Sequence, residues 1–206
     1  MHLLILGATG RVGSHITALA LKGGHHVTAL VRTPERIQVH DENLKIIQGN
    51  VLVQADIDCA IPGTDIVISA LNTDETTTLS GSIPLIIEAM YHENIRRIIT
   101  IGTAGILQSR VSPNMLRYQS SESRRKSTRA AEEHHRVYSL LKPSALEWTI
   151  VCPTYLPYGE YTGNYRVERD YLPEGGTQIS VMDTAEFAYH QMQDSQYIKC
   201  RVGISY

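Results

Sequence analysis

The sequence predicts an α/β fold, a doubly wound parallel sheet in a single domain. Along the 206 residues, short apolar runs alternate with segments that have the periodicity of helices, which is typical of a parallel sheet covered on both faces. A glycine-rich turn directly follows the first apolar run, and no internal repeat or low-complexity linker interrupts the alternation. Because a chain of this length can bury one core, we expect one domain over residues 1–206.

The first half of the chain carries five expected strands. They are apolar runs bounded by glycine, proline or polar turn residues, over 3–6, 26–31, 44–47, 65–71 and 95–101. Three segments between them have apolar residues at helical spacing, over 12–20, 55–61 and 83–91. Two glycines end the first of these helices, and Pro62-Gly63 ends the second.

The second half begins with a polar stretch over 108–129, and a loop of that length indicates a lid or a partly disordered segment. A helix follows over 130–141 and stops before Pro143, and a sixth strand over 148–152 is closed by Pro153. Residues 154–176 are rich in Tyr, Pro and Gly, which favours a loop with at most one short hairpin. A helix over 184–192 and a strand over 201–205 complete the pattern.

Composition excludes several classes of protein. The formal net charge of −2 gives no electrostatic reason to bind nucleic acid or an anionic membrane. No apolar run approaches the roughly 20 residues that cross a bilayer, and the run at the N-terminus is too short for a signal peptide. The three cysteines lie far apart without a CxxC spacing, which favours a reducing compartment. We therefore expect a cytoplasmic protein.

The turn over 7–13 reads Gly-Ala-Thr-Gly-Arg-Val-Gly and lies between a buried strand and an amphipathic helix, the context of a Rossmann-type dinucleotide site. Gly7 permits the tight turn, Gly10 lets the backbone approach a pyrophosphate, and Gly13 lets the helix pack on the sheet. The free amides and the dipole of that helix then bind the phosphates. The alternative is a tight strand-to-helix turn that holds no ligand.

The end of the second strand indicates which dinucleotide binds. An NAD site has an acidic residue about 20 residues after the glycines, to accept a hydrogen bond from the ribose. Here that place holds Arg32, with Arg36 one turn further on and no carboxylate to repel a phosphate. Guanidinium groups suit the 2′-phosphate, so we expect NADP(H). The alternative is that both arginines are merely solvated.

Motifs along nearly the whole chain resemble the atypical short-chain dehydrogenases with NmrA-like folds, and among them the biliverdin reductase B and flavin reductase type. They include the glycine turn, Leu30-Val31-Arg32, Gly49-Asn50-Val51, the stretches 63–68, 98–103 and 146–153, and Tyr161-Thr162-Gly163-Asn164-Tyr165. The resemblance implies an NADPH-dependent oxidoreductase that passes hydride to a planar acceptor such as a flavin, a tetrapyrrole or a quinone.

The same resemblance assigns site residues. Besides Gly7 and Gly13, the pyrophosphate would be bound by Thr9, Gly10, Arg11 and Val12, and the 2′-phosphate by Arg32 and Arg36. The rest of the cofactor would meet Asn50, Val51, Leu71, Asn72, Gly102, Thr103, Pro153, Thr154 and Tyr155. Thr103 replaces a serine and keeps its hydroxyl, whereas Tyr155 stands where the flavin and biliverdin reductase has a histidine. Cys152 stands where many NmrA-like relatives carry an arginine.

Catalysis would depend on Thr103 and Tyr155, with solvent or Tyr155 supplying any proton. A Tyr-x-x-x-Lys pair, Tyr138 and Lys142, matches the dyad of other short-chain dehydrogenases. It lies late in its helix, so we interpret it as a surface pair. Four tyrosines (Tyr155, Tyr158, Tyr161 and Tyr165) could stack on a flat acceptor or merely pack a loop. The acceptor pocket would be built largely from 103–129 and 154–180.

Several further signals are set aside. The basic run Arg124-Arg125-Lys126 could attract an anionic substrate but is more typical of a solvated loop. His134 and His135 diverge on one helix, so no metal site is expected. A second function stays open, an NmrA-type redox sensor that binds NADP(H) without turnover. A sugar-nucleotide epimerase would need a larger substrate domain. The sequence leaves the oligomeric state open.

Overall fold

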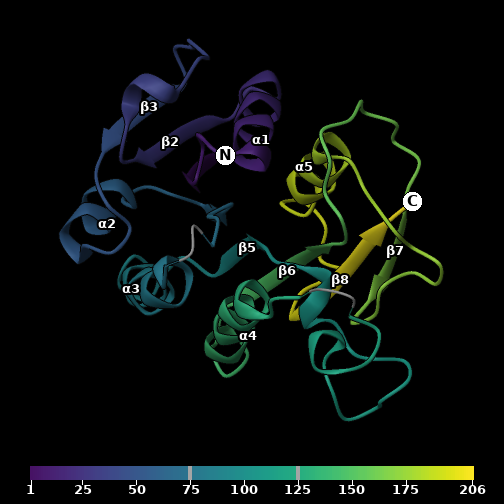
Figure 1. Cartoon of the computed structure of the whole chain (residues 1–206). Coiled ribbons are helices and arrows are strands. Elements are labelled where there is room, and N and C mark those ends of the chain that lie inside the picture. Colours follow the sequence, from purple (N-terminus) through teal and green to yellow (C-terminus); the bar gives the residue numbers. More distant parts are fainter. Residues whose placement is uncertain (74–75, 124–125) are drawn as a thin grey trace.

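The computed structural model describes residues 1–73, 76–123 and 126–206. One eight-stranded sheet runs through it in the order β3-β2-β1-β4-β5-β6-β8-β7 (Figure 1). All neighbouring strands are parallel except β7 and β8, which are antiparallel. The chain therefore forms the single-domain, doubly wound sheet that the sequence predicts, and its two halves diverge from β1 and β4.

The strands are β1 (His2–Leu6), β2 (His26–Val31), β3 (Leu44–Gln48), β4 (Ile66–Ser69), β5 (Arg97–Ile101), β6 (Glu147–Pro153), β7 (Arg166–Arg169) and β8 (Cys200–Ser205). The α-helices are α1 (Arg11–Lys22), α2 (Gln54–Ala60), α3 (Thr78–His92), α4 (Arg129–Leu141) and α5 (Val181–His190). Three 3₁₀ turns complete the described elements, η1 (Pro34–Arg36), η2 (Ala104–Ile106) and η3 (Arg117–Gln119).

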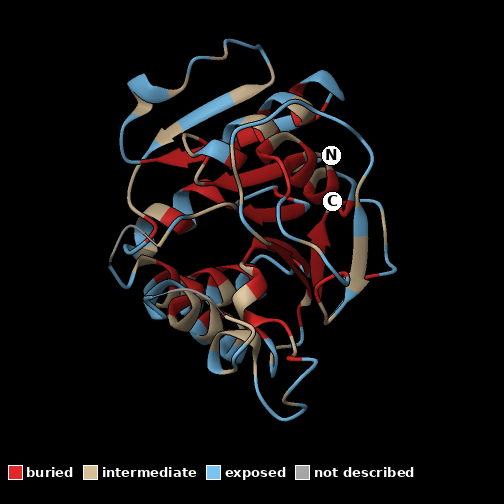
Figure 2. Ribbon diagram, turned by 45° about the vertical axis from the view of Figure 1, so that its right-hand side comes forward, coloured by how far each residue is buried: buried red, intermediate tan, exposed pale blue. Residues whose placement is uncertain are grey.

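Two apolar cores lie on opposite faces of the sheet. Helices α1 and α5 pack together over one face and enclose the first core, which includes Ile16 and Phe187. Helices α2, α3 and α4 cover the other face, where Ile57, Ile86 and Val137 are buried. Figure 2 shows the buried residues concentrated in the sheet and on the inner faces of the helices. Burial on both faces explains why the central strands are continuous apolar runs.

The structure corrects one expected boundary and adds detail to two other segments. Helix α3 begins at Thr78, before the expected start at residue 83, because its first turn is polar and carries little apolar periodicity. The segment 154–176 contains no local hairpin, since its strand β7 pairs with β8, the last strand of the chain. In the polar stretch over 108–129, the described residues include η3, and the amide of Gln108 donates to the carbonyl of Asp170 at 2.8 Å.

Arg97 ties three elements together beneath the sheet. Its guanidinium donates to the carbonyl of Glu147 at 2.7 Å, to the hydroxyl of Thr149 at 2.8 Å and to the carbonyl of Gln191 at 2.7 Å. Burial lowers the pKa of Arg97 to about 10, so it stays charged at neutral pH. These acceptors stabilise the buried cation.

We expect Arg97→Met to lower the free energy of unfolding by about 3 kcal/mol, because it leaves buried acceptors without a donor. The neighbouring Arg96, whose side chain is 77% exposed, is the matched control. Arg96→Met should change the free energy by less than about 0.5 kcal/mol. Urea denaturation of both variants measures the difference, and equal effects would show that the buried contacts contribute little.

Candidate functional site at the carboxyl edge of the sheet

The parallel strands end at one edge, and their register brings the predicted site residues there. Leu6 lies opposite Leu30 and Ser69, Ser69 opposite Thr100, and Thr100 opposite Ile150. The segments that follow these residues are the glycine turn, Arg32, Leu71-Asn72, Gly102-Thr103 and Pro153-Thr154-Tyr155. Asn50 and Val51 follow β3 at the same edge, since Leu30 pairs with Ile47. Ligands of open α/β sheets bind at this edge.

The glycine turn is shaped by very close packing. Gly7 has φ +82°, and a Cβ there would lie 2.5 Å from the carbonyl oxygen of Ala70. A Cβ at Gly13 would lie 2.1 Å from the carbonyl oxygen of Gly7, so α1 rests directly on the turn. At Gly10 the nearest atom would be 3.2 Å away, and no severe clash excludes a side chain there. Gly10 therefore has the property expected of a position that a ligand approaches.

The remaining turn residues divide by exposure. Val12 is buried, and its amide lies in the first turn of α1 where it has no partner within the helix, whereas Arg11 is exposed. The Arg11 guanidinium donates to the carbonyl of Leu156 at 2.8 Å and lies 5.4 Å from the ring centroid of Tyr158. The turn and the loop after β6 are thus joined by one cation.

A cavity of about 600 Å³ lies beside the glycine turn, between α1 and the segment 35–39 that follows β2. Arg36 lines it together with Thr9, and Arg32 is exposed nearby in sequence. Glu35 lines the same cavity. The end of β2 itself carries no carboxylate, whereas Glu35 belongs to the turn η1 that follows and shares the cavity with Arg36.

At the end of β3, Asn50 is held by a residue that the sequence analysis missed. The backbone amide of Asn50 donates to a carboxylate oxygen of Asp56 at 2.7 Å. Its side-chain oxygen accepts a hydrogen bond from the backbone amide of Leu52 at 3.0 Å. The side-chain NH₂ is then the group that Asn50 can offer to an adenine edge. Val51 is buried and can contribute its backbone there.

Residues after β5 and β6 adjoin each other. The amide of Gly102 donates to the carbonyl of Val151 at 2.7 Å, and a Cβ at Gly102 would lie 2.6 Å from Ile150. Thr103 caps η2, and its hydroxyl oxygen accepts from the amide of Gly105. Pro153 is buried, Thr154 donates its hydroxyl to the carbonyl of Thr177 at 3.1 Å, and Tyr155 is 59% exposed.

Cys152 lies below this surface. Burial raises the pKa of its thiol to about 12, the Arg201 charge opposing that rise. The thiol therefore stays protonated at neutral pH and is inert.

The four tyrosines do not form one cluster. Tyr165 donates to Glu186 at 2.5 Å and packs edge-on against Phe187, so it belongs to the core beside α5. Glu186 also raises the pKa of Tyr161, whose hydroxyl turns toward that carboxylate. Tyr155, Tyr158 and Tyr161 are all exposed, but only Tyr155 and Tyr158 have no such acidic neighbour. The stacking hypothesis is therefore restricted to these two side chains.

Asp183 anchors the far end of the loop that carries these tyrosines. Its fully buried carboxylate accepts from the amides of Thr162 and Gly163, each at 2.9 Å, and from the hydroxyl of Tyr206 at 2.6 Å. The near end is held by the amide of Val181, which donates to the carbonyl of Pro157. A sequence pattern gave no sign of this role, since the donors come from distant segments.

The Tyr138 and Lys142 pair lies away from the edge. Tyr138 packs edge-on against Trp148, which precedes Pro153 by five strand residues or roughly 16 Å. The Lys142 amine is 5.7 Å from the Tyr138 ring centroid. This position agrees with the prediction that the pair has no part in catalysis. The Tyr138 ring is half-buried, however, so the expected surface location of the pair is only partly correct.

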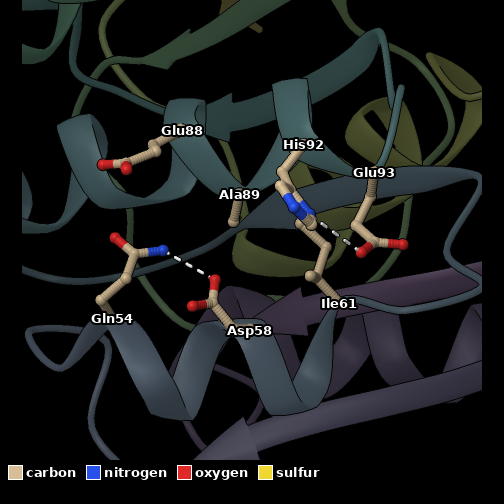
Figure 3. A pocket seen from close by; sticks show the side chains of 7 residues that line it. All are labelled: Gln54, Asp58, Ile61, Glu88, Ala89, His92 and Glu93. Atoms are coloured by element: carbon tan, nitrogen blue, oxygen red, sulfur yellow. Dashed lines mark hydrogen bonds and ion pairs between the residues drawn. The ribbon is translucent and has the colours of Figure 1, made fainter.

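A second cavity, of about 250 Å³, lies between α2 and α3 and contains none of the predicted site residues. Figure 3 shows Asp58 accepting a hydrogen bond from Gln54, with His92 beside Glu93 on the opposite wall. Within the described ranges, no group of three His, Cys, Asp or Glu residues is arranged to bind a metal. Arg124 and Arg125 of the basic run lie outside the described residues.

The sheet order and the glycine turn at its carboxyl edge define a dinucleotide-binding protein of the Rossmann class. A family model described as NAD(P)H-binding matches residues 7–195. The chain therefore belongs to this NAD(P)H-binding family, in agreement with the cofactor predicted from the sequence. In the part of the chain that the structure describes, no helix has both the length and the apolar character to cross a membrane.

Solved structures with the same fold cover the whole chain. A candidate epimerase from Bacteroides thetaiotaomicron is 28% identical, with a TM-score of 0.86 and 96% of that chain covered. A candidate NADH-flavin reductase from Streptococcus pneumoniae is 26% identical, with a TM-score of 0.84 and 99% covered. A short-chain dehydrogenase/reductase from Veillonella parvula in complex with NADP is 19% identical, with a TM-score of 0.77 and 94% covered; at this identity the likeness shows the fold alone.

The packing of the turn predicts different outcomes for two glycines. Gly13→Ala should lower the free energy of unfolding by about 3 kcal/mol, since its methyl group would collide with the Gly7 carbonyl. Gly10→Ala should cost about 1 kcal/mol and weaken NADPH binding about tenfold, because its methyl group meets the cofactor. Denaturation and calorimetric titration of both variants separate these effects. Unimpaired NADPH binding by the Gly10 variant would contradict the assignment.

Asp183 gives a prediction with a pH dependence. Burial alone would raise its pKa, but the hydrogen bonds from Tyr206, Gly163 and Thr162 outweigh burial and hold the pKa below its ordinary value. Asp183→Asn should therefore lower the free energy of unfolding by about 2 kcal/mol at neutral pH. The difference from the wild type should shrink as the pH falls through the lowered native pKa. Urea denaturation between pH 7 and acid tests this, and a difference independent of pH would contradict it.

Proposed function

We propose that the protein is an NADPH-dependent oxidoreductase that delivers hydride to a planar acceptor such as a flavin, a tetrapyrrole or a quinone-like ring. The observation that carries this proposal is the convergence, at one sheet edge, of the glycine turn with Thr103 and Tyr155. The resemblance to NmrA-like reductases of the biliverdin reductase B and flavin reductase type supports it. The likeness to the candidate NADH-flavin reductase, over almost the full length of both chains, agrees with it.

The residues at the edge fit the cofactor. Exposed Arg32 and Arg36 suit a phosphorylated adenosine, and the amides at the start of α1 suit the diphosphate. When bound, NADPH supplies a hydride from its nicotinamide ring. The protein's part is to hold that ring beside Gly102 and Pro153 and to align the acceptor above it.

Thr103 is assigned the role of hydrogen-bond donor in this site. Because its oxygen accepts from the Gly105 amide, its own hydroxyl proton can point to a ligand. Tyr155 offers an exposed ring and a phenol on the adjacent segment. An acceptor with a built-in electron sink needs alignment more than a strong acid, which fits a site whose proton donors are hydroxyl groups.

Two other functions are weighed against this proposal. A redox sensor would bind NADPH and reduce no acceptor, and the same residues would serve it. An epimerase agrees with the relative from Bacteroides thetaiotaomicron, which has no larger substrate domain than this chain because the two cover each other almost completely. The position of Tyr138 far from the edge removes the dyad that an epimerase of this class would use.

The decisive experiment mixes purified protein with NADPH and FMN, riboflavin or a quinone and follows the nicotinamide absorbance. Oxidation that depends on the acceptor supports the reductase. NADPH binding without oxidation of any acceptor contradicts it and favours the sensor.

We expect Thr103→Val to lower kcat/KM about a hundredfold, since one hydrogen bond to the reacting ligands is lost. Thr103→Ser keeps the hydroxyl and is the matched control, with a loss of less than about threefold. Steady-state oxidation of NADPH with the best acceptor measures both variants. If valine and serine had equal effects, the hydroxyl would have no part in the reaction.

A further inference from the structure

Arg201 is a buried cation of β8 to which the proposed reaction assigns no role. Its side chain is 7% exposed, and its Nε atom donates to a carboxylate oxygen of Asp170 at 3.1 Å. The guanidinium carbon lies 4.4 Å from the ring centroid of Tyr138 in α4. Because an unpaired charge is unfavourable in the interior, a cation at this place depends on such contacts.

A further contact of Arg201 reaches the candidate site. Its guanidinium donates to the carbonyl of Ile106 at 2.6 Å, and Ile106 is the last residue of η2. The residue that caps η2 at its other end is Thr103, whose hydroxyl is assigned to the proposed reaction. One short turn therefore joins the buried cation to the reacting surface.

The position of η2 depends on its neighbours. The turn has three residues, and the amide of Ile106 donates to the carbonyl of Thr103 at 3.1 Å. A 3₁₀ turn has poorer hydrogen-bond geometry than an α-helix and is stable only in short pieces. Helix α4 contacts η2 closely, since a Cβ at Gly105 would lie 3.1 Å from the Cβ of Ala131. Arg201 adds the charge-assisted hydrogen bond that fixes the end of the turn.

Asp170 connects Arg201 to the segment that follows η2. It has φ +59°, its amide donates to the carbonyl of Arg201 at 2.7 Å, and its own carbonyl accepts from the amide of Gln108 at 2.8 Å. Its carboxylate binds the guanidinium of Arg201 at the same time. The residue that orients the Arg201 side chain is therefore also bonded to the chain just beyond Ile106.

We propose that Arg201 and Asp170 are positioning residues, which hold η2 so that the Thr103 hydroxyl is directed at the bound nicotinamide. The inference rests on the proposed function and adds to it two residues that lie below the carboxyl edge, since Arg201 pairs with Ile150. A displacement of about 1 Å can lower a rate about a hundredfold. The cofactor is bound mainly along the glycine turn, so the expected effect is a lower kcat with little change in NADPH affinity.

The test is a double-variant cycle that measures steady-state oxidation of NADPH. Arg201→Met should lower kcat about tenfold in the presence of Thr103. Beside Thr103→Val the same change should lower kcat less than about twofold, because no hydroxyl is left to position. Calorimetric titration should show NADPH affinity within about twofold of the wild type. A loss of equal size in both backgrounds would show a general structural effect and overturn the proposal.

Arg110→Met is the matched control. The Arg110 side chain is 40% exposed, and its guanidinium donates to Glu168 at 2.5 Å and to the carbonyl of Leu172 at 3.2 Å, outside η2. It should change kcat less than about twofold. A loss as large as that of Arg201→Met would contradict a specific role of the buried pair.

Asp170 supplies a second pair of variants, because Arg201→Met also removes a buried ion pair and can weaken folding. Asparagine and glycine both tolerate the positive φ of this residue. Asp170→Asn keeps an oxygen that accepts from Arg201, whereas Asp170→Gly removes it. We expect kcat to fall about fivefold for glycine and less than about twofold for asparagine. Equal losses in two variants with equal melting temperatures would overturn the role of the carboxylate.

Fluorescence of bound NADPH reads the same cycle without an acceptor, since nicotinamide emission depends on the groups around the ring. Arg201→Met should change this emission in the presence of Thr103 and leave it unchanged beside Thr103→Val. If this pattern appears and no acceptor is reduced, the proposed reductase fails and the positioning role stands. If acceptors are reduced but kcat and emission respond equally in both backgrounds, the positioning role fails and the reductase stands.

Discussion

The contact between the first helix and the first turn is the constraint on which the site depends. The space between Gly13 and the Gly7 carbonyl is too small for any side chain, and Gly7 in turn rests on the backbone of Ala70. These contacts fix the amino end of α1 against β1 and β4 at once. Because the helix cannot move away from the strands, its free amides stay directed at the carboxyl edge, where the register of β4, β5 and β6 delivers the other site residues. The cofactor side of the site is thus organised by backbone packing and needs no ligand to form.

The acceptor side is built differently. The loop after β6 is fixed at two places, near Pro157 by the start of α5 and at Thr162-Gly163 by Asp183, and the residues between them are exposed. A cation from the glycine turn, Arg11, meets this exposed stretch at Leu156 and Tyr158. A diphosphate bound at the turn would compete for the same guanidinium. The loop that would choose an acceptor is therefore connected to the cofactor side of the site through the Arg11 side chain. The contacts that hold this loop in place, at Pro157 and at Thr162-Gly163, lie outside the proposed reacting surface.

The sequence predicted the parts of this structure that depend on local patterns. Central strands were recognisable because both of their faces are buried, and the glycine turn because its spacing and context are specific. The sequence did not predict which way a side chain points in the folded structure. Tyr165 and Tyr155 look alike in a Tyr-rich stretch, yet one packs on Phe187 and the other faces solvent. Strand β7 was missed because a short, charged edge strand has a weak pattern and its partner lies at the end of the chain. Glu35 was missed because a 3₁₀ turn, not the strand, presents it.

The chemistry of the edge limits which reactions the proposed reductase can perform. Cys152, the thiol next to Pro153 at the end of β6, has a pKa raised to about 12 by burial, so it is neither a nucleophile nor an acid near neutral pH. Thr103 contributes a hydroxyl that donates a hydrogen bond and does not ionise. Tyr138, whose ring lies near the Lys142 amine, packs against Trp148 in the first half of β6, away from the carboxyl edge. Such a site can orient a hydride acceptor but has little means to protonate an alkoxide as it forms. A simple ketone needs that proton, whereas a flavin or quinone-like ring spreads the added charge over its own atoms, and this difference is the physical reason to favour planar acceptors over carbonyl substrates.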